Sequence, residues 1–212
     1  AMMREAASRG HQTWAAQQKN ISFIENKVMV NARQLSILDD RSAWYEVLES
    51  KELAPAEIDG IIMRKDPPFD MEYIYSTYLL ESLEQDGCVV FNRPRSIRDF
   101  NEKLAITKYP EFIAPTVVTA DHTTIKQFID KNNEIILKPL DGMGGSSIFR
   151  SRPDDPNLGV IIETLTDFGR RTIMVQKFIP QIKDGDKRVL LIDGEAVPFS
   201  LARIPQGSDH RG

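Results

Sequence analysis

The sequence has 212 residues, 41% of them hydrophobic and 27% charged, a balance that excludes an intrinsically disordered chain. This length allows one large domain or two modest ones, and two fit better. Lysine and arginine together number 27 against 31 aspartates and glutamates, and the net charge of −4 excludes a general attraction to nucleic acid or to an anionic membrane.

The cysteine content excludes an intrachain disulfide and a thiolate metal cluster, because Cys88 is the only one. It opens the apolar run Cys88–Phe91, and we interpret it as a buried structural thiol rather than a nucleophile. No stretch approaches the roughly 18 apolar residues of a membrane span, and no signal segment opens the chain. We therefore expect a reducing, cytoplasmic location.

Residues 1–100 are expected to form an N-terminal α/β domain. It begins with a helix that ends at Gly10, followed by short strands and a further helix. The first helix is predicted over residues 1–9, the strands over residues 13–16, 21–24 and 27–30, with a hairpin turn at Glu25-Asn26, and the second helix over residues 42–48.

A strand–helix–strand unit ends this domain. The apolar strand Ile61–Met63 leads through the loop Arg64–Asp70 into a helix that Asp70 caps and that continues to Gly87, before the strand Cys88–Phe91. Such a unit implies parallel pairing, so we expect an open parallel sheet. The loop leaves the carboxyl end of a parallel strand, where such sheets bind ligands, so it could contact a substrate. A structural turn is at least as good an interpretation.

Residues 101–212 are expected to form an α+β domain, with the boundary near Phe100. A helix from Ser96 to about Lys108 leads into it. The elements that follow are strands over residues 116–119, 134–138 and 173–178, helices over residues 121–131 and 158–168, and a hairpin of residues 188–192 and 195–204 around Asp193-Gly194.

Both ends of the chain suggest a longer protein. The first helix has no strand before it, and the chain stops in the polar loop Pro205–Gly212. We therefore expect that the first domain lacks its first strand and that the second domain is incomplete at its C-terminus.

A glycine-rich loop follows the strand at residues 134–138 and leads into a short apolar run rather than a helix. It lacks the Gly-Lys-Ser/Thr ending of a P-loop and the helix of a dinucleotide fold. A flap whose backbone N–H groups approach phosphate oxygens is the remaining functional interpretation, and an ordinary flexible hairpin is equally compatible. The loop residues concerned are Gly142, Met143, Gly144, Gly145 and Ser146.

Two strand ends carry further candidates. Lys138 ends an apolar strand beside the glycine loop, where it could reach phosphate oxygens or simply extend into solvent. The strand before Pro180 could pair its last backbone groups with an adenine edge, and a plain buried strand is the alternative. Its last residues and the hinge that follows are Gln176, Lys177, Phe178 and Ile179.

Two arginines are predicted to share one face of the C-terminal hairpin. A two-residue turn at Asp193-Gly194 sets a register in which Arg188 faces Phe199, and Arg203 then lies on the same face, about 13 Å away. This spacing suits an extended anionic ligand charged at both ends. For either arginine alone, a solvated sheet face is the better interpretation.

Several blocks recur along the chain in a fixed order: Met63–Asp70, Asn101–Leu104, Ile136–Gly145, Ile182–Leu190 and Leu201–Gly207. In order and spacing they resemble the prokaryotic-type glutathione synthetases of the ATP-grasp superfamily. The resemblance covers almost the whole chain and is weakest over residues 1–55. It implies an N-terminal open parallel-sheet, pre-ATP-grasp domain followed by an ATP-grasp domain.

The resemblance implies a reaction and roles for residues. ATP and Mg²⁺, with Mn²⁺ as an alternative, would activate the carboxylate of γ-glutamylcysteine as an acyl phosphate, which the amine of glycine attacks to release ADP, phosphate and glutathione. Lys103, a surface lysine on any other interpretation, would hold phosphates together with Lys138 and the flap. Residues 176–179 would hold adenine, and Asp186 would contact the ribose. The phosphoryl group and the carboxylates would be neutralised by Arg188, Arg203 and Arg211.

One departure from the family concerns the metal. Its ligands there are acidic and asparagine side chains on late strands that these 212 residues do not include, so no metal ligand is assigned. Another ATP-grasp ligase, such as a glutamate or D-alanine ligase, is the alternative enzyme, which the Arg64–Asp70 block disfavours. A non-catalytic nucleotide-binding module is the alternative of another class. The resemblance also implies a homo-oligomer, a tetramer or a dimer.

Overall fold

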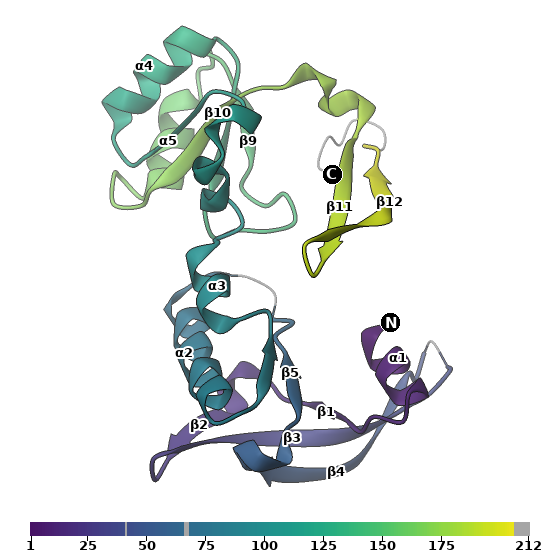
Figure 1. The fold of residues 1–212 in the computed structure, drawn as a ribbon. Helices are drawn as coiled ribbons and strands as arrows, with labels where there is room; N and C mark the ends of the chain where they lie inside the picture. The colour runs from purple at the N-terminus through teal and green to yellow at the C-terminus, as the bar shows by residue number, and fades with distance from the viewer. Residues whose placement is uncertain (41, 66–67, 206–212) are drawn as a thin grey trace. The chain divides into compact units, whose positions relative to one another are not determined.

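The computed structural model describes residues 1–40, 42–65 and 68–205. The chain divides into two compact units, Ala1–Asn101 and Glu102–Gly212, and each is described by itself (Figure 1). Every helix in the described part of the chain is too short or too polar to cross a membrane.

A four-stranded antiparallel sheet forms the larger part of the first unit. The long central strand β3 pairs with β1 and β2 along one edge and with β4 along the other. Glu25 and Asn26, between β2 and β3, both have positive φ, which confirms the predicted hairpin turn. The elements are α1 (Met2–Ser8), β1 (Thr13–Ala15), a 3₁₀ turn (Gln18–Asn20), β2 (Ile21–Ile24), β3 (Lys27–Ile37) and β4 (Tyr45–Leu53).

The helix predicted over residues 42–48 is wrong, because β4 occupies most of this segment. The strand pairs with β3 from Tyr45, opposite Ile37, to Leu53, opposite Val30. Its leucines, glutamates and lysine favour a helix locally. Pairing along nearly the whole length of β3 outweighs that weak local preference.

The strand–helix–strand unit is confirmed. A 3₁₀ turn (Pro55–Glu57), β5 (Gly60–Ile62), α2 (Met71–Gln85), β6 (Val89–Phe91) and α3 (Pro94–Asp99) follow in order. Strands β5 and β6 pair in parallel, and the Asp70 carboxylate accepts a hydrogen bond of 2.8 Å from the Tyr73 N–H at the start of α2. Within the described residues the parallel pairing is limited to these two strands, so the expected open parallel sheet is largely replaced by an antiparallel one.

The core of the first unit lies between the sheet and α2. It is formed by Val28, Val30, Ala32, Leu53, Leu80, Leu83, Cys88 and Val90. The Cys88 thiol is buried, and its Sγ donates a hydrogen bond to the Pro55 carbonyl at 3.2 Å. The predicted burial is confirmed. Burial, assisted by the charges of Asp86 and Asp59, raises the pKa of this thiol, which favours a structural over a nucleophilic cysteine.

A second four-stranded sheet, in the order β7-β10-β8-β9, organises the second unit, and each pairing in it is antiparallel. Its strands and helices are β7 (Thr116–Thr119), α4 (His122–Asn132), β8 (Ile135–Pro139), β9 (Phe149–Ser151), α5 (Leu158–Thr166) and β10 (Ile173–Lys177). The predicted helix over residues 96–108 is broken. Pro94 starts α3 early, and the chain resumes only as the 3₁₀ helices Leu104–Lys108 and Pro110–Phe112.

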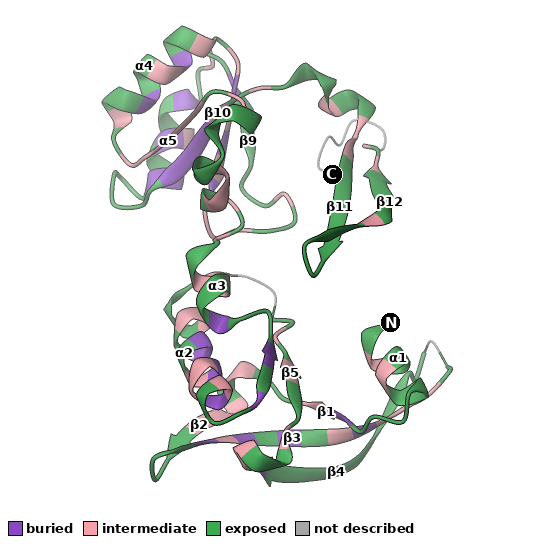
Figure 2. Ribbon diagram, in the orientation of Figure 1, coloured by how far each residue is buried: buried purple, intermediate pink, exposed green. Residues whose placement is uncertain are grey.

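One face of this sheet packs against α4 and α5. The core residues alternate along the strands, as Ile135 and Leu137 do on β8 and Ile173 and Val175 do on β10, and they meet Ile125 and Ile129 of α4 and Leu158, Ile162 and Leu165 of α5. Figure 2 shows the buried residues gathered on β10 and on the two helices. The other face, which we call the open face, carries the alternate residues Thr116, Ile136, Lys138, Arg150, Met174 and Gln176.

The C-terminal hairpin is confirmed. A 3₁₀ turn (Pro180–Asp184) precedes β11 (Asp186–Ile192) and β12 (Glu195–Arg203), joined by Asp193 and Gly194, both with positive φ. Both strands are exposed along most of their length (Figure 2).

Truncating the core of the second unit should be costly. Ile162→Ala leaves a cavity beneath the sheet and should lower the free energy of unfolding by about 2–5 kcal/mol in denaturant titrations. Val160→Ala, on the exposed side of the same helix, is the control and should change it by less than about 0.5 kcal/mol. Equal losses in both variants would contradict the assignment of the two faces.

Candidate functional site

Lys138 lies on the open face of the sheet, on β8, paired with Met174 of β10. Burial lowers the pKa of its ammonium group, and the charge of Lys103 lowers it further, against a smaller opposing effect of Glu102. Among the described residues, the Lys138 ammonium has no hydrogen-bond or ion-pair partner. A half-buried cation beside a second cation is suited to bind an anion.

Lys103 is brought to the glycine loop although the helix predicted to carry it does not form. It lies at the start of the 3₁₀ helix Leu104–Lys108, and its side chain is only 13% exposed. Its ammonium donates a hydrogen bond to the Gly142 carbonyl and lies 2.6 Å from the Glu102 carboxylate. The structure therefore brings Lys103 to Lys138 and the glycine loop, which lie 35 or more positions later in the sequence.

The glycine loop connects β8 to β9, so the predicted strand–glycines–strand arrangement is confirmed. Gly144 and Gly145 have φ of 63° and 76°, a conformation that residues with a side chain rarely adopt. At Gly142 an added Cβ would lie 3.2 Å from the Pro139 ring. The Ser146 N–H bonds to the Met143 carbonyl at 3.2 Å, which closes a turn within the loop.

The predicted adenine hinge follows β10. The Gln176 side-chain amide donates to the Thr116 hydroxyl at 2.8 Å, on the open face. The N–H groups of Lys177 and Phe178 donate to the carbonyls of Pro115 and Glu134, both at 2.9 Å, so neither amide is available to an adenine in this structure. Ile179 is 53% exposed.

Two residues that the sequence did not single out adjoin this hinge. The Arg150 guanidinium carbon lies 3.9 Å from the centre of the Phe178 ring. The same guanidinium bonds to Glu134, with Nε 2.9 Å from Oε1. The sequence alone could have placed Arg150 on the same face as Lys138 only if the pairing register of β8 and β9 were known. That register comes from the structure.

The hairpin places Arg188 and Arg203 on one face, as predicted, but in a different register. Around Pro198, which has no N–H to donate, the pairing shifts, so that Arg188 faces Leu201 rather than Phe199 and Arg203 faces Asp186. The two arginines are then two residues apart along the ribbon, about 7 Å instead of about 13 Å. The predicted spacing of about 13 Å is therefore wrong, and the shorter spacing no longer supports a long ligand charged at both ends.

Asp186 and Arg203 form an ion pair. Arg203 Nε donates to Asp186 Oδ1 at 2.7 Å, and a second bond joins the guanidinium to Oδ2. These hydrogen bonds lower the pKa of the Asp186 carboxyl, despite some burial, and the charge of Arg188 contributes less. Gly185, which precedes the strand, has a φ of 94°, and a Cβ there would lie 2.5 Å from the Arg203 carbonyl oxygen. Arg211 lies outside the described residues.

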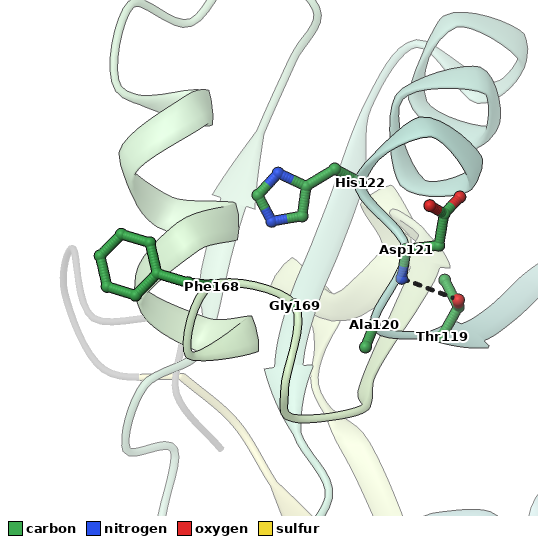
Figure 3. Close-up of a pocket in the computed structure, with 6 residues that line it drawn as sticks. All are labelled: Thr119, Ala120, Asp121, His122, Phe168 and Gly169. Atoms are coloured by element: carbon green, nitrogen blue, oxygen red, sulfur yellow. Dashed lines mark hydrogen bonds between the residues drawn. The ribbon is translucent and has the colours of Figure 1, made fainter.

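A shallow concavity of about 550 Å³ lies elsewhere in this unit, where β7 leads into α4 and α5 leads into β10 (Figure 3). It contains no residue predicted for the site. The Thr166 hydroxyl donates to the Ile162 carbonyl at 2.7 Å and accepts from the Gly169 N–H, so His122 Nε2, 3.1 Å away, must donate its proton to it. His122 thus closes the end of α5 in a structural role.

A metal ion would need a cluster of ligand side chains. Within residues 1–40, 42–65 and 68–205, no group of three or more His, Cys, Asp or Glu side chains is arranged to hold a metal ion. The cations and the glycine loop fit the phosphates of a nucleotide, because they offer positive charge and unobstructed backbone at one end of the open face.

Known proteins resemble this chain along its whole length. Residues 102–212 match the family described as "Prokaryotic glutathione synthetase, ATP-grasp domain", and residues 1–98 match the N-terminal domain of the same synthetase. The chain is 53% identical to a glutathione synthetase of Nitrosomonas europaea, with 100% of this chain and 67% of the relative covered. It is 49% identical to that of Shewanella oneidensis, with the same coverage.

A solved structure shares the fold. The ATP-grasp ligase PsnB, complexed with a phosphomimetic variant of a minimal precursor, Mg and ADP, superposes with a TM-score of 0.58 at 18% identity, covering 99% of this chain and 68% of that one. At this identity the likeness concerns the fold alone.

Removing the Lys103 ammonium should loosen the glycine loop. Lys103→Met removes the hydrogen bond to the Gly142 carbonyl, and amide hydrogen exchange in residues 142–147 of the ligand-free protein should accelerate about tenfold. Glu102→Gln, which leaves that bond in place, is the control. Unchanged exchange in Lys103→Met would show that this bond does not hold the loop.

The titration of Asp186 should depend on Arg203. In Arg203→Leu, the pKa of the Asp186 carboxyl should rise toward its ordinary value of 3.8, as followed by NMR. Because the native pKa is lowered, the ion pair stabilises the hairpin above that ordinary value, and the stabilisation is lost as the pH falls through the native pKa. Arg188→Leu should produce a smaller rise. A larger one would reverse the assigned pairing.

Proposed function

Because the chain belongs to the prokaryotic glutathione synthetases, a family of ATP-grasp ligases, we propose that it joins γ-glutamylcysteine to glycine at the expense of ATP, giving glutathione, ADP and phosphate. The identities of about half the residues over the whole chain favour this reaction over that of another ATP-grasp ligase. They also disfavour a non-catalytic nucleotide-binding module.

The reaction needs activation because a carboxylate is a poor acceptor for an amine. ATP supplies the phosphoryl group that converts the cysteinyl carboxylate of the peptide into an acyl phosphate. The glycine nitrogen then forms a bond to the acyl carbon, the bond to the phosphate oxygen breaks, and the nitrogen loses a proton. The protein's contribution is to bind, orient and neutralise charge.

One observation carries this proposal: Lys138, Lys103 and the glycine loop meet at one end of the open face, while the hinge meets its other end. Along β8, Ile135, opposite Lys177, and Lys138 are separated by about 10 Å. A nucleotide lying along the open face would place its base at the hinge and its phosphates at the lysines. The loop residues 142–146 would then cover the phosphates.

The roles in the hairpin are proposed with one adjustment. Asp186 would meet the ribose, and Arg188, Arg203 and Arg211 would neutralise the phosphoryl group and the carboxylates of the substrates. Because Arg203 is paired with Asp186, the two act as a unit, and binding of the ribose must share that carboxylate with the guanidinium. Arg188, on the same face, is the arginine best suited to meet a phosphate directly.

The remaining proposals concern the whole protein. We propose Mg²⁺, or Mn²⁺ in its place, as the ion that accompanies ATP, and we assign no residue of this chain to it. Residues 1–100 would form the substrate-side domain and residues 101–212 the nucleotide-binding domain. A homo-oligomer, a tetramer or a dimer, in the cytoplasm is the expected setting.

Replacing Lys138 tests the proposal. In the complete gene product, phosphate release should require ATP, the metal, γ-glutamylcysteine and glycine together, and Lys138→Ala should reduce kcat/KM for ATP by about 10²–10³-fold, the usual cost of losing one charge-stabilising group. Lys131→Ala, on the exposed end of α4, is the control and should leave it unchanged. Phosphate release that does not depend on the peptide would refute the ligase.

A further inference from the structure

Glu134 holds Phe178 in two ways. Its carbonyl accepts the Phe178 N–H at 2.9 Å. Its carboxylate Oε1 lies 2.9 Å from Nε and 2.7 Å from Nη2 of Arg150, whose guanidinium covers the Phe178 ring with Cζ 3.9 Å from the ring centre. We call this set the Glu134–Arg150–Phe178 clamp.

The clamp lies on the open face, at the end opposite Lys138. Arg150 is paired with Ile136, on the same face as Lys138, and Phe178 continues the alternation of Met174 and Gln176. The residues of the clamp come from the position just before β8, from β9 and from the hinge. Three segments of the chain therefore fix one aromatic ring at the place proposed for the base of the nucleotide.

The charges within the clamp are stable at neutral pH. Burial raises the pKa of Glu134, but hydrogen bonds from Arg150 and Arg152 outweigh this effect and leave the pKa below its ordinary value. The side chain of Glu134 is 21% exposed and that of Arg150 is 46% exposed. The ion pair is thus partly shielded from water and from salt.

We propose that the Glu134–Arg150–Phe178 clamp positions the hinge for the base of ATP, with Arg150 as a positioning residue that acts through the Phe178 ring. The inference rests on the proposed function. A ring fixed before the ligand arrives spares the entropy cost of ordering it on binding, so the clamp raises affinity for the purine nucleotide. The Arg150 guanidinium is held at the hinge by Glu134 and Phe178, so we assign it no part in phosphoryl transfer.

A matched pair of variants tests this. Arg152 bonds the same carboxylate oxygen, with Nε at 3.0 Å, and no contact of its guanidinium with the Phe178 ring is found among the described residues. In the complete gene product, Arg150→Met should raise KM for ATP about five- to tenfold with kcat nearly unchanged. Arg152→Met should raise it less than about twofold, and neither should change KM for the peptide or for glycine.

A double-mutant cycle tests the route through the ring. If Arg150 acts through Phe178, the effects of Arg150→Met and Phe178→Leu on KM for ATP should be less than additive. Additive effects, equal shifts in Arg150→Met and Arg152→Met, or a fall in kcat at constant KM would each overturn the proposal.

Two further measurements keep the outcomes separate. If Arg150→Met does not fold, Arg150→Lys keeps a charge for Glu134 and loses the planar contact, and an unchanged KM for ATP in that variant would overturn the proposal. If the wild-type protein turns over normally and Arg150→Met has the wild-type KM for ATP, the clamp is refuted and the proposed function is not. Absence of turnover in the wild type refutes the proposed function, and the dissociation constant for ATP then replaces KM as the readout for the clamp.

Discussion

The burial of one face of the β7-β10-β8-β9 sheet beneath α4 and α5 determines what the second unit can offer a ligand. Side chains on a strand alternate between faces, so each residue committed to the core, such as Leu137 or Val175, commits its neighbours to the open face. Lys138 and Gln176 are such neighbours. The surface proposed to bind the nucleotide is therefore set by the same hydrophobic pattern that makes the core.

The two lysines illustrate how a folded chain can hold an arrangement that is unfavourable without its ligand. Lys138 is half-buried and close to Lys103, and both effects disfavour its charged form. Lys103 is compensated by the Gly142 carbonyl and by Glu102, whereas Lys138 has no hydrogen-bond or ion-pair partner within the described chain and gains only a smaller effect from the charge of Glu102. An anion that binds both ammonium groups relieves the repulsion between them. The free energy of that repulsion then adds to the affinity for the anion.

How much the sequence could predict depends on the range of the interactions involved. Strong local signals were sufficient for the Asp70 cap, for the turns at Glu25-Asn26 and Asp193-Gly194, and for the glycine loop between strands. The β4 strand was missed because its pairing partner, not its composition, decides its conformation. The hairpin register was missed because Pro198 displaces pairing several residues from the turn. Arg150 was missed because its contact is with Phe178, 28 positions later in the sequence.

Gly185 imposes a different kind of limit on the hairpin. Its positive φ disfavours any residue with a side chain, and a Cβ there would lie only 2.5 Å from the carbonyl oxygen of Arg203, on the partner strand. The two demands coincide at the residue that directs the chain into β11. A hairpin moved into a related protein must therefore include this glycine. The sequences of the two strands alone do not set the direction in which the chain enters β11.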